Sequence, residues 1–178
     1  AMDLARANFS YFNEPAVFSV SDASALPFPD ASFDVVTSIG LMEHLDDYSG
    51  ILKEAYRVIK PGGIMIQINI PKKKSIQILN NMYRYVLTLS GKQLRPDFPR
   101  NTDIPETYAL SAREAGFVDV ATTNVNPFPL FVPVPMSVDR VLARVYRLIL
   151  SLRSRLFSYP FETSYGLSQC HFLVGWKK

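Results

Sequence analysis

A strand–helix–strand pattern constrains the fold of this chain more than any other feature of its sequence. Residues 33–38 (FDVVTS) form an apolar, β-branched run, which is typical of a strand buried on both faces. Residues 46–60 place apolar side chains at helical spacing, and Pro61-Gly62-Gly63 predicts the end of that helix. Residues 64–70 are predicted as the next strand. A strand, a helix and a second strand joined by so short a glycine-rich connection predict a right-handed βαβ unit, and therefore a parallel sheet.

Weaker patterns on both sides of this unit extend the prediction to the rest of the chain. We expect, in chain order, a helix over residues 4–12, a strand over 17–21, a helix over 102–115, a strand over 117–125 and a last strand over 169–176. The alternation of strands and helices indicates an α/β fold. In full, we expect a Rossmann-like, mostly parallel sheet with flanking helices.

Two segments do not fit the sheet and are predicted as helical cap insertions, at about 72–101 and 127–164. The first contains a helix with Ile76, Leu79, Tyr83, Val86 and Leu87 on one side. The second begins with four prolines in nine residues and continues as a basic, amphipathic helix over 136–157. One face of that helix carries Val138, Leu142, Val145, Ile149, Leu152 and Leu156, and the other carries Arg140, Arg144, Arg147 and Arg155. The core is then about 1–71, 102–126 and 165–178 of a single domain, 1–178.

Composition excludes several classes of protein. With 178 residues, 48% hydrophobic and 20% charged, the chain is long and apolar enough to bury a core. A net charge of +3 is too mild to indicate nucleic acid as a partner. One cysteine, Cys170, excludes an intramolecular disulfide and is compatible with a cytoplasmic location. Two isolated histidines and one cysteine give no metal-ligand spacing, so no metal is expected. No apolar run of 18 residues or more is present, and no signal peptide is visible.

Candidate binding residues lie where the predicted parallel strands end, because such sheets bind ligands beyond the carboxyl ends of their strands. Asp22-Ala23 follows one strand, Ser38-Ile39-Gly40 the second and Ile70-Pro71 the third. The Asp22 carboxylate could accept a hydrogen bond from an exocyclic amine such as that of adenine, and Gly40 would allow a ligand to approach the backbone. Alternatively, Asp22 only caps a turn and Ser38 only ends a strand.

The stretches SDASALPFPDASFDVVTSIGLMEHLDD and ILKEAYRVIKPGG closely resemble the class I S-adenosylmethionine-dependent methyltransferases, in the group usually called methyltransferase type 11. The matching motifs are Asp22-Ala23, Leu26-Pro27-Phe28, Phe33-Asp34, Ser38, Glu43-His44-Leu45 and residues 57–63. The resemblance implies S-adenosylmethionine as cofactor. It implies that Asp22 bonds the adenine amine, that the Ala23 backbone contacts the ring, and that Ser38 borders the methionine portion.

One departure from the family pattern is large. The glycine-rich loop after the family's first strand, and the acidic residue after its second, have no counterpart in residues 1–178. The N-terminal strands of the family fold are therefore expected to be absent, which leaves a strand edge unpaired. Either the sequence is a fragment, or another chain or a rearranged strand fills the gap. We expect residues 1–178 alone to bind S-adenosylmethionine weakly or not at all.

Methyl transfer mainly requires that the two reactants are positioned and that water is excluded. A general base is needed only for an acceptor with a proton of high pKa, and His44 is the candidate; otherwise it only packs or caps. Apolar cap residues Tyr83, Val86, Val145 and Ile149 would favour a small hydrophobic or lipid-like acceptor, unless they pack on the sheet.

The basic helix 136–157 leaves three uses open: a solvated face, peripheral contact with anionic lipid, or a grip on an acidic substrate. A homo-oligomer is also open. The rival hypothesis from another class is a non-catalytic, methyltransferase-like interaction domain that lacks the cofactor loop. A nucleotide-sugar or nicotinamide enzyme is the weaker rival, since no Gly-x-Gly-x-x-Gly fingerprint is present.

Overall fold

The structure, a computed structural model, describes residues 2–70, 74–91 and 99–125, nine positions between 141 and 156, residues 165 and 168, and residues 170–178. The described elements are α1 (Met2–Tyr11), β1 (Phe33–Ile39), the 3-10 helix η1 (Met42–His44), α2 (Ser49–Val58), β2 (Ile59–Asn69), α3 (Lys74–Leu89), α4 (Pro105–Glu114), β3 (Val118–Val125) and β4 (Cys170–Trp176). The nine positions between 141 and 156 are helical as well.

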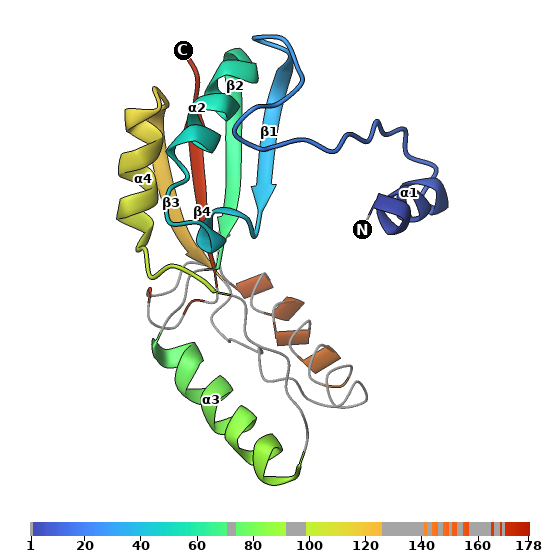
Figure 1. The fold of residues 1–178 in the computed structure, drawn as a ribbon, viewed down its shortest axis with the longest axis vertical. Helices are drawn as coiled ribbons and strands as arrows, with labels where there is room; N and C mark the ends of the chain where they lie inside the picture. The colour runs from blue at the N-terminus through green and yellow to red at the C-terminus, as the bar shows by residue number, and fades with distance from the viewer. Residues whose placement is uncertain are drawn as a thin grey trace.

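The four strands form one mixed sheet in the order β1-β2-β4-β3 (Figure 1). β1 and β2 are parallel and joined by α2, which confirms the predicted βαβ unit. β4 runs antiparallel to both of its neighbours, β2 and β3. Three of the four strands therefore point the same way, and their carboxyl ends meet at one end of the sheet.

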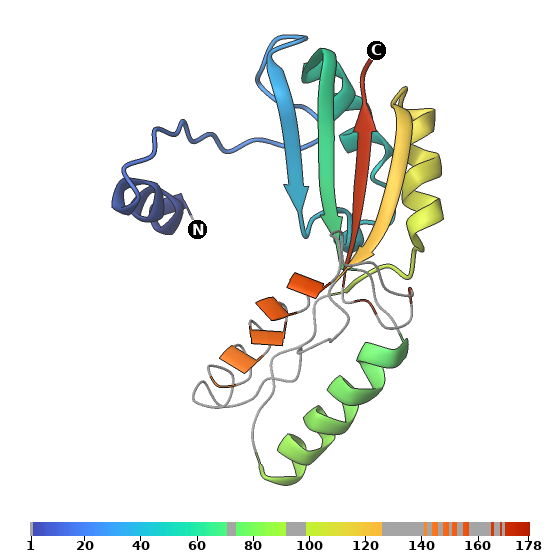
Figure 2. The same cartoon turned by 180° about the vertical axis from the view of Figure 1, so that it is seen from behind.

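Helices α2 and α4 cover one face of this sheet, and the main core lies between them and the strands. Leu52 of α2, Tyr108 of α4 and Met65 of β2 are fully buried there. The opposite face carries no described helix (Figure 2). On β1, Val35 is 49% and Ile39 70% exposed. The prediction that residues 33–38 are buried on both faces is therefore wrong for the described structure, because only one layer of helices packs on the sheet.

The Pro61-Gly62-Gly63 segment does not end the preceding helix, as the sequence predicted. α2 already ends at Val58, and all three residues lie within β2. Ile59 pairs with Phe33, and the pairing then shifts so that Val35 lies opposite Ile64. The extra residues form an irregularity in which Gly62 adopts a φ of +81°, a conformation that glycine takes without steric cost.

Residues 17–21 do not form the predicted strand. Their backbone has no regular structure, and Val17 and Val20 are 96% and 83% exposed. Only Asp22 makes an isolated bridge, with Ala25. A β-branched run is stable as a strand only when a neighbouring strand and a packed face are present, and among the described residues this run has neither.

The described helical residues of the two predicted cap segments lie outside the sheet. α3 falls within residues 72–101, and the helical positions between 141 and 156 fall within 136–157. Both lie beyond the carboxyl ends of β1 and β2 (Figures 1 and 2). The side chains of Ile76, Leu79, Tyr83, Val138 and Leu142 and the Pro-rich residues 127–135 lie outside what the structure describes. Val86, Val145 and Ile149 are exposed and do not pack on the sheet.

Candidate functional site

The carboxyl ends of β1 and β2 are held side by side by backbone hydrogen bonds. Ser38 lies opposite Gln67 in the parallel ladder and is half-buried. Gly40 leaves the strand with a φ of +67°, and its N–H donates to the Ile68 carbonyl over 2.9 Å. The positive φ turns the chain sharply out of β1 toward η1. A ligand placed beyond this end meets a stretch of backbone that lacks a side chain at Gly40.

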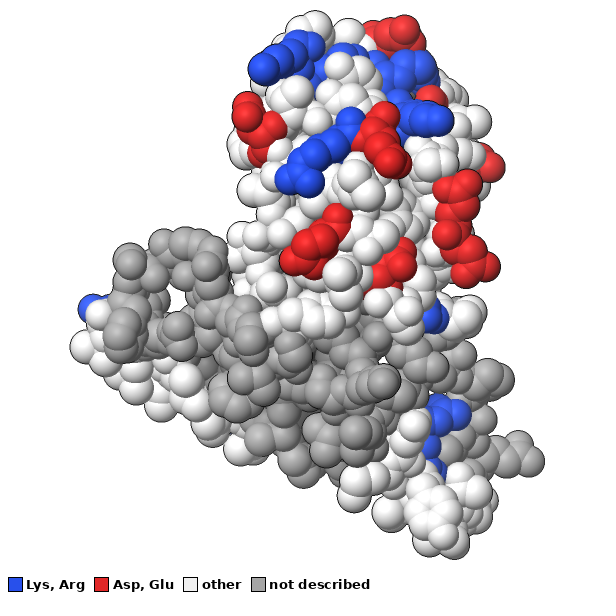
Figure 3. All heavy atoms as spheres, turned by 90° about the vertical axis from the view of Figure 1, so that its left-hand side faces the viewer, with Lys and Arg blue, Asp and Glu red and all other residues white. Residues whose placement is uncertain are grey.

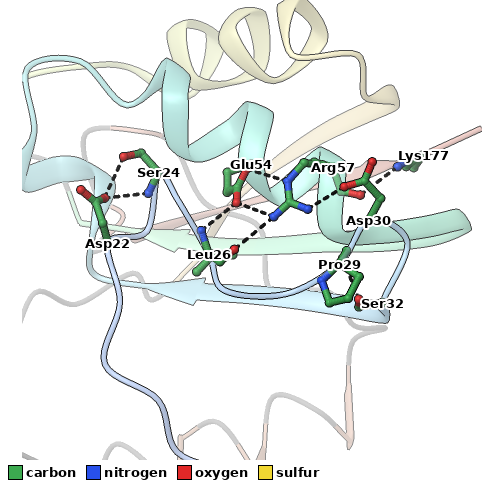
Figure 4. A network of polar contacts seen from close by, with 9 residues as sticks. All are labelled: Asp22, Ser24, Leu26, Pro29, Asp30, Ser32, Glu54, Arg57 and Lys177. Carbon is green, nitrogen blue, oxygen red and sulfur yellow. Dashed lines mark hydrogen bonds and ion pairs between the residues drawn. The ribbon is translucent and has the colours of Figure 1, made fainter.

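Asp22 and Ala23 lie in a tight turn at the same end of the sheet. The Asp22 Oδ1 atom accepts hydrogen bonds from the Ser24 N–H at 2.8 Å and from the Ser24 hydroxyl at 2.7 Å (Figure 4). A Cβ added to Gly50 would lie 3.4 Å from the Ser24 Cβ, so the turn packs against the first turn of α2. The loop after β1 leads directly into that turn, which brings Asp22 and Ser38 to one end of the sheet.

The two hydrogen bonds from Ser24 set the ionisation of Asp22. The backbone bond is the larger cause and the hydroxyl bond the second, and both lower the pKa of the Asp22 carboxyl below its usual value. The carboxylate is therefore charged at neutral pH. Its contribution to stability is present above the unfolded-state pKa and is lost as the pH falls through the lowered folded-state pKa. Both bonds use Oδ1, which leaves Oδ2 to accept a bond from a ligand.

The Ser24→Ala variant is expected to raise the pKa of Asp22 only part of the way to its ordinary value, because the Ser24 backbone N–H still donates. A carboxyl-carbon NMR titration of Asp22 measures this change. Ser32→Ala is the matched control: its hydroxyl donates to the Pro29 carbonyl over 2.7 Å and should leave the Asp22 pKa unchanged. An Asp22 pKa that stays the same in the Ser24→Ala variant would contradict the assignment.

A guanidinium fixes the loop that carries this turn onto α2. Arg57 contacts Glu54 and Asp30 at 2.6 Å each and donates to the Leu26 carbonyl at 3.1 Å. Glu54 in turn accepts the Leu26 N–H at 2.7 Å (Figure 4). The hydrogen bonds from Arg57 lower the pKa of Glu54, and the carboxylates raise the pKa of Arg57. The loop position behind Asp22 is thereby set by a bidentate pair, the most directional kind of ion pair.

Glu43 and Asn101 form a buried polar seam across the same end of the sheet. The Glu43 side chain is 1% exposed, and its Oε1 accepts the Ile70 N–H at 3.2 Å. The Glu43 carbonyl accepts the Asn101 N–H at 2.6 Å. Asn101 also donates through Nδ2 to the Met42 and Leu45 carbonyls, each at 3.1 Å, and its Oδ1 accepts the Tyr108 hydroxyl at 2.7 Å.

Two stacked tyrosines, one before α2 and one on α4, lie beside the seam. Tyr48 and Tyr108 stack with ring centroids 5.0 Å apart, and the Tyr48 hydroxyl donates to Asp103 at 2.9 Å. Burial raises the pKa of both hydroxyls, so each remains a neutral donor across the physiological range. His171 of β4 is fully buried, and its ring centroid lies 5.1 Å from that of Tyr108.

His44 is exposed at the end of η1, next to the seam. Its Nδ1 lies 2.7 Å from the Pro99 carbonyl oxygen. Because a carbonyl only accepts, Nδ1 carries the proton, and in the neutral ring the lone pair lies on Nε2. Among the described residues, no group of three or more His, Cys, Asp or Glu side chains could hold a metal ion.

Sequence reasoning found Asp22, Ala23, Ser38, Gly40 and His44 as candidates, and the structure places all five at one end of the sheet. Their roles stay predictions. It missed Asn101, which no local pattern marks, since its partners Met42 and Leu45 lie more than fifty residues away. Glu43 belongs to one of the matching motifs, but no role was predicted for it. Its apolar neighbours Leu41, Met42 and Leu45 were the signal that could have marked its side chain as buried.

Part of the chain is similar in sequence to known proteins. Residues 1–67 match the model of a family described as the methyltransferase domain. Over these residues the chain resembles a methyltransferase domain. A demethylmenaquinone methyltransferase of Geobacillus kaustophilus is 34% identical over 115 residues, which cover 56% of this chain and 47% of that protein. One of Listeria monocytogenes is 45% identical over 76 residues, covering 40% and 31%. The chain thus spans less than half the length of these curated methyltransferases.

Solved methyltransferase structures share the fold. A SAM-dependent methyltransferase of Thermotoga maritima superposes with a TM-score of 0.53 at 21% identity, covering 89% of this chain and 62% of that one. A SAM-dependent methyltransferase of Archaeoglobus fulgidus gives 0.50 at 19% identity, covering 87% and 65%. At these identities the likeness shows the fold alone, an α/β Rossmann-like fold.

Proposed function

We propose that this chain binds S-adenosylmethionine at the carboxyl ends of β1 and β2 and transfers its methyl group to a hydrophobic, quinone-like acceptor. One observation carries the proposal: the charged Asp22 turn and the Ser38–Gly40 strand end lie at one end of the sheet, the turn packed on the first turn of α2. The family match supports the chemistry, and the names of the relatives support the acceptor class.

The residues present fit the adenosine part of such a ligand. Asp22 offers a charged Oδ2 for the exocyclic amine, and the adjoining Ala23 backbone would face the ring edge. Ser38 and the bare backbone at Gly40 would border the amino-acid part. The bound cofactor would supply a sulfonium methyl group. Transfer of that methyl group to an acceptor would leave the cofactor as a neutral thioether, so the chain itself would only have to hold the two reactants together.

The chain's own contribution is mainly positioning. Arg57 fixes the Asp22 loop on α2, and the Glu43–Asn101 seam fixes the strand ends. A reduced quinone carries phenolic hydroxyls, and loss of one hydroxyl proton makes a ring carbon a better nucleophile. The carbon that gains the methyl group would then lose its own proton as the ring becomes aromatic again, and the hydroxyl would regain a proton. His44 Nε2 is the candidate to take the hydroxyl proton, because the bond from Nδ1 to Pro99 sets the tautomer.

Titration with S-adenosylhomocysteine, followed by amide NMR of the chain, tests cofactor binding even when it is weak. We expect the largest shift changes at residues 22–24 and 38–40. Asp22→Asn should weaken binding about tenfold, because a hydrogen bond to a charged group contributes about 1.5–3 kcal/mol. Asp34→Asn is the matched control: Asp34 is exposed at the other end of β1, paired with Lys60 at 2.9 Å, and its loss should not change affinity.

The same titration separates the proposal from its rival. The non-catalytic alternative is favoured by the open edge of β1, which has no second strand partner among the described residues. No shift change at millimolar ligand would contradict the cofactor site and favour an interaction domain. Shift changes confined to residues outside the two expected segments would place binding elsewhere and contradict the roles of Asp22 and Ser38.

A further inference from the structure

Two helices outside the sheet expose apolar stripes. On α3, Met82, Tyr85, Val86 and Leu89 follow the spacing i, i+3, i+4, i+7 and are 61–71% exposed. The helical positions between 141 and 156 expose a longer stripe, 46–75% exposed: Val141, Val145, Leu148, Ile149, Leu152 and Leu156. Large apolar side chains gathered on one helix face, rather than scattered singly, mark an interaction surface.

The same two segments hold most of the positive charge of the chain. Residues 72–101 and 127–164 contain 12 of the 19 Lys and Arg but only 3 of the 16 Asp and Glu, a net charge of +9. The remaining residues therefore carry a net charge of −6. On the face shown in Figure 3, the described acidic side chains all lie over the sheet and its helices, and none lies over the lower part of the molecule.

Arginines border the longer stripe. Arg144 and Arg155 are exposed, and Arg144 lies next to Val145 while Arg155 lies next to Leu156. Long basic side chains of this kind can keep their charge in a headgroup layer while the apolar face enters the acyl boundary. Among the described residues, no helix is long and apolar enough to cross a membrane. The arrangement fits a helix that lies along a surface.

We propose that the exposed stripes of α3 and of residues 141–156 form a docking surface for an anionic lipid bilayer. A nucleic acid would match the charge but would leave the apolar stripes without a partner. A second copy of the chain, packed symmetrically on the same surface, would bring two basic surfaces together. A bilayer with anionic headgroups satisfies both the charge and the apolar area. The proposal holds whether or not the chain transfers methyl groups.

Co-sedimentation with vesicles tests the docking surface on the whole chain. At about 0.1 M salt, where the Debye length is about 10 Å, partition into vesicles containing phosphatidylglycerol should exceed partition into pure phosphatidylcholine at least about tenfold. The double variant Leu148→Glu/Leu152→Glu should lose at least about tenfold of that binding. Both leucines are exposed, at 60% and 51%, so the fold should survive. Circular dichroism checks this.

Two matched controls make the result specific. Leu110→Glu changes a leucine that is 56% exposed on α4, away from the surface, and should bind vesicles like the parent chain. Arg144→Glu/Arg155→Glu should abolish the preference for phosphatidylglycerol, whereas Lys53→Glu on the exposed side of α2 should leave most of it. Equal loss in Leu110→Glu and in the double variant would overturn the proposal. So would a dimer in light scattering that the double variant dissociates while vesicles are not bound.

Discussion

Replacing Gly63 by alanine is expected to lower the free energy of unfolding by about 3 kcal/mol, as a clash in a close-packed region does. A Cβ at this position would lie 2.6 Å from Ile59 Cγ2, 2.8 Å from the Asp34 carbonyl oxygen and 2.9 Å from the Lys60 carbonyl oxygen. Two of the three are backbone atoms, which cannot move without disturbing the pairing of β1 with β2. Urea unfolding followed by circular dichroism measures the loss.

Gly50→Ala is the matched control for this prediction. Its Cβ would meet Ser24 Cβ at 3.4 Å, an ordinary contact, and the position lies within α2. Alanine is favoured over glycine in a helix by about 1 kcal/mol, so the change should be neutral or stabilising. If Gly63→Ala lowers the free energy of unfolding no more than Gly50→Ala does, the close contacts between β1 and β2 do not require a glycine at position 63.

The second large effect is expected at Asn101. Asn101→Ala would remove the hydrogen bonds that the Met42 and Leu45 carbonyls and the Tyr108 hydroxyl make to this side chain in a mostly buried region, and the Met42 carbonyl would keep only the Leu45 N–H. Each lost hydrogen bond costs about 1 kcal/mol, and an unsatisfied buried group costs more, so about 3 kcal/mol should be lost. Thermal or urea unfolding of the variant measures the change.

Tyr108→Phe separates the seam from a general packing effect. It removes only the bond from the tyrosine hydroxyl to Asn101 Oδ1 and should cost about 1 kcal/mol. The loss of unfolding free energy in the double variant should be smaller than the sum of the two single losses, because both changes remove this same bond. An Asn101→Ala variant no less stable than Tyr108→Phe would show that the bonds to Met42 and Leu45 contribute nothing.

The βαβ unit could be predicted from sequence because its signals are local. The β-branched run and the helical spacing both lie within residues 33–70, and the structure places β1, α2 and β2 there. The same local reasoning failed at residues 17–21. Val17 and Val20 have the propensity of a strand, but a strand also needs a neighbour, and propensity cannot reveal whether one is present.

Long-range contacts explain what the sequence could not predict at the candidate site. Pro61 to Gly63 were expected to stop a helix, whereas pairing of Ile59 with Phe33 draws them into β2. The contact of His44 with Pro99 and those of Asn101 with Met42 and Leu45 join segments far apart in the chain. A polar residue in a loop has no local signature that announces such partners, so its role became visible only in three dimensions.

The Glu43–Asn101 seam has an evolutionary consequence. It ties the ends of β1 and β2 together through residues 40–45, 68–70 and 101–108, and none of its bonds involves the exposed side chains of α3 or of residues 141–156. Mutations can therefore accumulate on those helices without breaking the hydrogen bonds of the seam. A lineage of such chains could therefore vary these two helices freely while the hydrogen bonds that join the strand ends are inherited unchanged.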